Sequence, residues 1–196
     1  ASDVYKRQVQ MAAFLIALKM RGETPSDIAA GAGSLRRHAL TLDAPDNAMD
    51  IVGTGGDGIG TYNISTATAL VLAGAGIPIA KHGNKAVSSK SGAADVLTAL
   101  GINLDCSEEA LSEALTAAKI VFLMAPRHHS AMRHVGPIRA ELGVRTIFNL
   151  LGPLSNPALV RRILVGVFDA RWLQPFAEAL RTLGTTDAFI CLLYTS

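Results

Sequence analysis

The pattern of hydrophobic and polar positions changes its period near residue 46. Before that point, "VQMAAFLIALKMRG" (9–22) has apolar residues at helical spacing and ends at a glycine. The next stretch places Thr24 as an N-cap, Pro25 in the first turn and Asp27 near the positive end of the helix dipole. These features predict two helices, which form a small helical domain over 9–45.

From residue 46 onward, short apolar runs alternate with helical stretches. The runs "MDIV", "IPIA", "IVFLM", "RRILVGV" and "AFI" have the length of strands, and 65–75, 92–100, 108–118 and 170–183 have helical spacing. This alternation predicts an α/β domain over 46–190, with a mainly parallel central sheet covered on both faces. A helix predicted over 127–143 interrupts the alternation, and we expect about 128–143 to rejoin the helical domain.

Composition narrows the class of protein. Hydrophobic residues make up 49% of the chain, charged residues 17%, and the formal net charge is +2, which favours a globular protein and gives no footprint of a nucleic-acid surface. The longest apolar run (67–80) is broken by Gly and Pro and is too short for a bilayer, so we predict no contact with a membrane. Two cysteines without metal or disulfide spacing fit a reducing cytoplasm.

Both ends of the chain look foreign to the rest. Codons for "DVYKRQ" (3–8) and "CLLYTS" (191–196) can be chosen so that one is largely the reverse complement of the other. Such a pair is typical of translated adaptors that flank a piece of a gene. We therefore predict that 1–8 and 191–196 are adaptor-derived tails around a native segment; two ordinary termini are the alternative.

Two polar, glycine-containing loops follow neighbouring predicted strands. "GTGGDGIGTYNIST" (53–66) leaves backbone N–H groups unscreened before a helix, and "KHGNKAVSSKSG" (81–92) supplies three lysines and several hydroxyls. Either loop alone has a plain interpretation: a tight turn with Asn63, Ser65 or Thr66 as an N-cap, or a solvated loop. Because the carboxyl ends of parallel strands meet at one edge of the sheet, the pair together predicts a site for a ligand with two phosphate groups.

These loops and "RTIFNLLGPLSNPA" (145–158) stand in the order and spacing of the anthranilate phosphoribosyltransferase family, which this chain resembles over about 11–187. The resemblance implies transfer of the phosphoribosyl group of phosphoribosyl pyrophosphate (PRPP) to anthranilate, with release of pyrophosphate and help from Mg²⁺, in tryptophan biosynthesis. It also implies a helical domain beside an α/β domain, and a homodimer in the full-length protein.

The same resemblance implies the site residues. For PRPP they are Gly53, Gly56, Asp57, Thr61, Asn63, Ser65, Thr66, Lys81, His82, Gly83, Asn84, Ser88 and Ser89. For anthranilate they are Gly53, Asn84, His82, His129 and Arg139, with the planar fork of Arg139 suited to a carboxylate. Ser65 matches a magnesium contact, while the acidic pair that completes the metal site in the family lies beyond Ile190.

Alternatives remain at this stage. Without the resemblance, Arg139 is more simply a surface ion-pair partner. His128, His129 and His134 lack the spacing of a zinc site. For the whole chain, the competing hypotheses are a catalytically inactive fragment and a related protein of the same fold that binds nucleic acid, which the small net charge disfavours.

Overall fold

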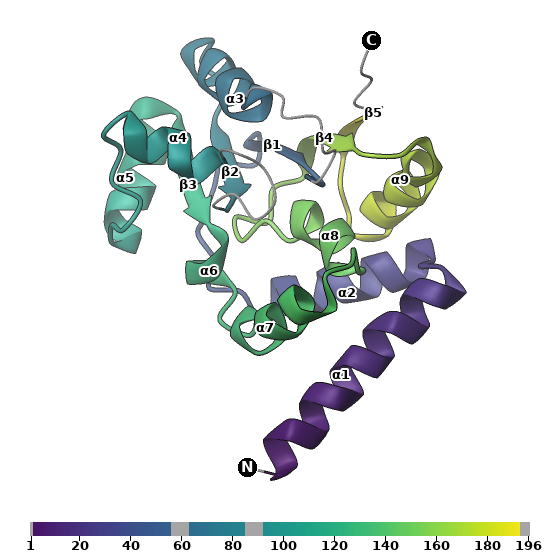
Figure 1. The fold of residues 1–196 in the computed structure, drawn as a ribbon. Helices are drawn as coiled ribbons and strands as arrows, with labels where there is room; N and C mark the ends of the chain where they lie inside the picture. The colour runs from purple at the N-terminus through teal and green to yellow at the C-terminus, as the bar shows by residue number, and fades with distance from the viewer. Residues whose placement is uncertain (1, 56–62, 85–91, 193–196) are drawn as a thin grey trace.

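The computed structural model describes residues 2–55, 63–84 and 92–192, with side chains from residue 7 onward. Helix α1 (Ser2–Arg21) begins earlier than the predicted 9–22 and reaches away from the sheet (Figure 1). Helix α2 (Pro25–Arg37) begins as predicted, because Thr24 Oγ1 accepts from Asp27 N–H at 3.2 Å and Asp27 Oδ2 accepts from Thr24 N–H at 2.9 Å.

Within the described ranges, five strands form one parallel sheet in the order β3-β2-β1-β4-β5. This confirms the predicted α/β class and its parallel sheet. In Figure 1 the strands run through the centre of the molecule, and α1 and α2 lie beyond one end of them. The bounds are β1 (Met49–Gly53), β2 (Ile79–Gly83), β3 (Ile120–Met124), β4 (Arg162–Val167) and β5 (Asp187–Leu192).

Helices cover both faces of this sheet, as the alternation predicts. On one face Ile51 packs with Ala69 of α3, and Phe122 packs with Leu97 of α4. Neighbouring side chains on a strand point to opposite faces, so Leu123 packs on the other face, with α5. On that face α9 also packs on β4. The bounds are α3 (Ile64–Gly74), α4 (Ala93–Ala99), α5 (Glu108–Ala118) and α9 (Leu173–Thr182).

The second strand extends further than its apolar run predicts. We expected a strand over 77–80 and a polar loop from Lys81, but β2 runs to Gly83, which places Lys81 and His82 inside the sheet. Both side chains are buried there. The assignment of Lys81 to a loop was therefore wrong, and the polar cluster begins within a strand.

The predicted helix over 127–143 is also wrong as one element. It is two helices, α6 (Ala125–His128) and α7 (Met132–Leu142), because His129 at φ −121° leaves the helical region. The predicted helix over 170–183 is likewise a 3₁₀ turn, η2 (Ala170–Trp172), followed by α9. Helix α8 (Phe148–Leu151) and turn η1 (Gly152–Leu154) were not predicted, since four residues are too few to show a period.

Helix α7 returns to the first two helices. Val135 of α7 packs against the same apolar cluster as Leu15 and Ile28, and Lys19 Nζ donates to Arg145 C=O at 2.9 Å. A groove of about 410 Å³ lies between α1, α2, α7 and α8. In the part of the chain that the structure describes, none of the helices is long and apolar enough to cross a bilayer.

Candidate functional site

Strand β1 ends in a turn that is held by hydrogen bonds to β4. Thr54 N–H donates to Gly166 C=O of β4 at 2.9 Å, and its hydroxyl donates to the same carbonyl at 3.3 Å. Gly55 follows with φ +65°, a left-handed conformation that favours glycine. The chain therefore leaves the sheet at the carboxyl end of β1, where Gly53 lies, as predicted for a ligand-binding turn. Three predicted residues of this loop, Gly56, Asp57 and Thr61, lie outside the described residues.

Helix α3 begins beside this turn with three polar residues. Asn63 occupies the N-cap position, but its side chain makes no capping hydrogen bond, so the N-cap interpretation of Asn63 is wrong. Ser65 is half-buried, and its hydroxyl accepts from Lys81 Nζ at 3.2 Å. Thr66 is buried, and among the described residues its Oγ1 has no hydrogen-bond partner. A buried hydroxyl without a partner is costly.

Strand β2 supplies the cation. Lys81 is 3% exposed, and its Nζ donates to Ile51 C=O at 2.6 Å as well as to Ser65. Burial lowers the pKa of Lys81, and the nearby Asp50 opposes that shift. An ammonium group has three N–H donors, and the described residues accept two of them. Among the described residues the third donor has no acceptor, and it lies between β1, β2 and the start of α3.

The end of β2 fits closely against β3. A Cβ at Gly83 would lie 2.8 Å from Phe122 Cε2, so glycine is required there for the ring to pack. Asn84 follows β2, and its backbone C=O accepts from Ala94 N–H at 3.4 Å. Ser88 and Ser89, the hydroxyls predicted for the second phosphate loop, lie outside the described residues.

Two histidines meet on the other face of β2. The ring centroids of His82 and His129 are 5.2 Å apart at an interplanar angle of 64°. His129 Nε2 donates to Ser155 C=O at 2.9 Å, whereas His82 Nε2 has no partner among the described residues. Burial, reinforced by the neighbouring His129, lowers the pKa of His82 to about 3. His82 is therefore neutral at physiological pH.

Arg139 lies against a different aromatic ring from these histidines. It lies on α7, half-buried, with its guanidinium 5.5 Å from the centre of the Phe148 ring. Burial lowers the pKa of Arg139, although such a group stays charged at neutral pH. Within the described residues, the structure thus joins Ser65 to Lys81 and His82 to His129, and leaves the role predicted for Arg139 as a prediction.

Two buried polar residues, Asp50 and Asn156, were not predicted from the sequence as part of the site. Asp50 is fully buried, and its carboxylate accepts from Asn156 Nδ2 at 2.8 Å and from His82 N–H at 3.1 Å. Burial raises the pKa of Asp50 to about 6, although the charge of Lys81 and these hydrogen bonds oppose the shift. The one available signal was the acidic residue inside the apolar run "MDIV", because a carboxylate in a covered strand requires partners.

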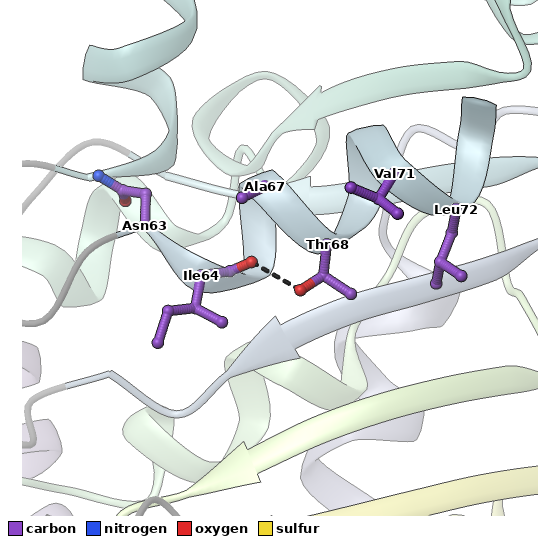
Figure 2. A pocket seen from close by; sticks show the side chains of 6 residues that line it. All are labelled: Asn63, Ile64, Ala67, Thr68, Val71 and Leu72. Carbon is purple, nitrogen blue, oxygen red and sulfur yellow. Dashed lines mark hydrogen bonds between the residues drawn. The ribbon is translucent and has the colours of Figure 1, made fainter. Parts of the chain in front are cut away.

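A hollow of about 420 Å³ also lies along α3, from its N-cap residue Asn63 to Leu72 (Figure 2). Its lining comes from one helix and is mostly apolar. The hydroxyl of Thr68 donates to Ile64 C=O at 2.8 Å, as the dashed line shows, so the proton of this hydroxyl already has an acceptor. This hollow has no cation and does not suit a phosphate. Its lining residues are Asn63, Ile64, Ala67, Thr68, Val71 and Leu72.

A complete magnesium site is not formed by the residues that the structure describes. The predicted ligand Ser65 faces the ammonium of Lys81, and in the described ranges no three His, Cys, Asp or Glu side chains come together as metal ligands do. Magnesium prefers six oxygen ligands. Ser65 alone does not satisfy that requirement.

Comparison with known proteins places both domains. A model of the glycosyl transferase family, a/b domain, matches residues 45–192, and a model of the helical bundle domain of that family matches residues 7–39. The anthranilate phosphoribosyltransferase of Parvibaculum lavamentivorans is 60% identical over 183 residues, which cover 93% of this chain and 54% of that protein. The enzyme of Rhizobium meliloti is 58% identical over 181 residues, which cover 92% and 54%.

Solved structures that resemble this chain carry the same enzyme name as these relatives. Anthranilate phosphoribosyltransferase from Thermus thermophilus has a TM-score of 0.88 and 52% identity, over 91% of this chain and 54% of that one. The enzyme from Saccharomyces cerevisiae in complex with PRPP and Mg has a TM-score of 0.88 and 34% identity, over 97% and 54%. The chain spans about half the length of the curated relatives it matches.

Proposed function

We propose that this chain, which belongs to the glycosyl transferase family, carries the PRPP-binding part of an anthranilate phosphoribosyltransferase. Because the chain spans about half of its relatives, the reaction is proposed for the whole protein. The observation that supports it best is Lys81, whose buried ammonium group lies between β1 and the start of α3. A phosphate placed there meets a cation, a hydroxyl and a helix N-terminus at once.

The residues proposed for the two substrates overlap at Gly53, His82 and Asn84 and differ in the elements that supply the rest. PRPP is bound at the ends of β1 and β2 and the start of α3, by Gly53, Gly56, Asp57, Thr61, Asn63, Ser65, Thr66, Lys81, His82, Gly83, Asn84, Ser88 and Ser89. Anthranilate is bound toward α6 and α7, by Gly53, Asn84, His82, His129 and Arg139. The contact of His82 with His129 supports this arrangement, because it brings the end of α6 next to β2.

In the proposed reaction, the amine nitrogen of anthranilate attacks C1 of the ribose. The bond between C1 and the pyrophosphate oxygen breaks, its electron pair leaves with pyrophosphate, and the nitrogen then releases a proton to water. Lys81 stabilises the charge that develops on the leaving group. Neutral His82 and His129 form a wall that orients the ring without adding a second positive charge near C1.

Magnesium enters as part of the proposal. The relative from S. cerevisiae was solved with PRPP and Mg. In this chain Ser65 is the proposed contact, and the remaining ligands come from substrate oxygens, water and residues outside the described ranges. Bound there, the ion would neutralise charge on the diphosphate.

A homodimer in the cytoplasm completes the proposal. Helix α1 exposes large apolar residues, Val9, Phe14 and Met20, of which Phe14 also lines the groove beside α2 and α7. Large apolar side chains exposed beside a groove are compatible with such an interface. Sedimentation of the full-length protein is expected to give a dimer, and Phe14→Glu is expected to give monomers. The free thiols of Cys106 and Cys191 are compatible with a reducing compartment.

The activity is tested in a chimera, in which residues 9–190 replace the matching segment of the P. lavamentivorans relative. With PRPP and Mg²⁺, the chimera is expected to consume anthranilate, measured as the loss of its fluorescence, and to release pyrophosphate in equal amount. A folded chimera that binds PRPP but leaves anthranilate unchanged would reject the proposed reaction. The unsubstituted relative serves as the positive control.

A further inference from the structure

The pairing of β1 with its two neighbours is unequal. With β4, five residue pairs run from Met49–Arg162 to Gly53–Gly166. With β2, by contrast, Met49–Ile79 is the single residue pair in register, although both strands lie wholly within the described residues. The carboxyl halves of β1 and β2 therefore lie side by side in one sheet without a regular ladder between them.

Side chains occupy the backbone groups that a ladder would use. Met49 N–H donates to Pro78 C=O at 3.0 Å, so a regular parallel ladder would next join Ile51 to Ala80 and His82. Instead, Ile51 C=O accepts from Lys81 Nζ at 2.6 Å, and His82 N–H donates to Asp50 Oδ1 at 3.1 Å.

Ala80 C=O accepts from Asn156 Nδ2 at 2.7 Å, which completes the replacement. Asn156 also donates to Asp50 Oδ2 at 2.8 Å, and its Oδ1 accepts from Ala158 N–H at 2.8 Å. Asp50 and Asn156 are both buried, and both have their hydrogen-bonding groups engaged. A buried network in which each member has partners fixes one arrangement of the strands.

We infer that Asp50 and Asn156 form a strand clamp, whose role is to keep β1 and β2 unpaired at their carboxyl ends and so to position Lys81 for the pyrophosphate group. The inference rests on the proposed function for the identity of the ligand. The clamp residues are positioning residues, because they act through Lys81 and His82. Without the Asp50 carboxylate, His82 N–H becomes available to Ile51 C=O, the carbonyl that holds the Lys81 ammonium.

The test is a double-mutant cycle between the clamp and Lys81, with inorganic pyrophosphate as the probe. Calorimetry is performed on the chimera and on the full 196-residue chain, at a temperature at which circular dichroism shows each variant folded. Asp50→Asn turns an acceptor toward Asn156 into a donor, and pyrophosphate affinity is expected to fall about 10-fold. In a Lys81→Ala background the same change is expected to alter affinity less than about 2-fold, because the effect passes through Lys81.

Two further variants separate positioning from general destabilisation. Leu180→Val removes buried volume on α9, and is expected to lower the unfolding midpoint while leaving pyrophosphate affinity unchanged in both backgrounds. The exchange of Asp50→Asn with Asn156→Asp restores the donor–acceptor pair between residues 50 and 156 but not the donor to Ala80 C=O, so it is expected to recover only part of the affinity that Asp50→Asn loses.

The outcomes distinguish this inference from the proposed reaction. Equal losses from Asp50→Asn with and without Lys81 would overturn the strand clamp, as would unchanged affinity in the single variant. An unsubstituted chimera that binds no pyrophosphate would also overturn it. A chimera that binds pyrophosphate with the expected coupling, yet does not consume anthranilate, would support the clamp and reject the reaction alone.

Discussion

Lys81 Nζ donates to the hydroxyl of Ser65 at 3.2 Å, which joins the middle of β2 to the first turn of α3. The two residues are 16 positions apart and belong to the two loops that the sequence singles out as suited to anions. Their contact brings a cation to the positive end of a helix, an arrangement that a bound anion stabilises. The geometry thereby connects the two predicted phosphate loops through one hydrogen bond.

The first prediction concerns this cation. Lys81→Ala in the chimera is expected to weaken PRPP binding by roughly 2 kcal/mol or more, as for the loss of a charge-assisted contact. Calorimetry at saturating Mg²⁺ provides the measurement. Lys119→Gln removes the same charge from an exposed position before β3 and is the matched control. Equal affinity in the unsubstituted protein and in Lys81→Ala would remove Lys81 from the site.

The position of this site could be predicted because it depends on topology. Alternating strands and helices predict a parallel sheet, and a parallel sheet brings the ends of β1 and β2 to one edge. The sequence did not predict that Lys81 and His82 are strand residues, because polar side chains normally end a buried apolar run. Here each is tolerated because it has partners: Lys81 contacts β1 and α3, and His82 contacts His129.

The strand clamp could not have been predicted from local pattern. Asp50 and Asn156 are 106 residues apart, and their hydrogen bond exists only once the segment after η1 folds against the sheet. The break between α6 and α7 is similar, since His129 leaves the helix where its ring contacts His82 and Ser155. Tertiary contacts of this kind override a helical period.

The second prediction concerns Arg139. Arg139→Lys keeps the charge but loses the planar fork, so in the chimera the KM for anthranilate is expected to rise while PRPP affinity changes little. Phe148→Leu removes the ring that Arg139 contacts at 5.5 Å and keeps the guanidinium. If Arg139 has only a structural role, the two variants will have the same kinetics, and both substrates will be affected alike.

The third prediction is a pH dependence of stability. His82 has a pKa lowered from 6.5 to about 3, so between these values the unfolded chain takes up a proton that the folded chain does not. Its contribution to the free energy of unfolding is complete above pH 6.5 and falls by about 1.4 kcal/mol per pH unit below it. Asp50 has a pKa raised from 3.8 to about 6, so between those values its contribution to the free energy of unfolding increases as the pH falls.

These opposing slopes can be separated by urea unfolding at several pH values between about 7.5 and 4.5. Relative to the unsubstituted chain, His82→Asn is expected to lose stability less steeply on acidification, and Asp50→Asn more steeply. His129, whose pKa is also lowered by burial, is common to all three proteins and cancels in the comparison. Parallel curves for the three proteins would show that neither side chain has the shifted pKa that its burial produces.

The fourth prediction concerns the packing of Gly83 against Phe122. Gly83→Ala places a methyl group 2.8 Å from the ring, which is expected to lower the free energy of unfolding by about 1–3 kcal/mol. Phe122→Leu removes the ring atoms that this methyl group would meet. The double variant is therefore expected to lose less free energy of unfolding than the two single variants lose in sum. Additive losses would show that the contact does not constrain residue 83.

The last prediction concerns the activity of this chain by itself, since it spans about half the length of its relatives. The described residues offer Ser65 as a metal contact, and no cluster of acidic ligands is found among them, so a diphosphate with several negative charges lacks a complete magnesium site. The 196-residue chain alone is therefore expected to turn over almost no anthranilate at saturating Mg²⁺, whereas the chimera is active. Pyrophosphate binding is expected to survive weakly, because Lys81 and the start of α3 lie within the chain. Circular dichroism confirms that the chain is folded, and turnover equal to that of the chimera would show that the second half is dispensable for the metal.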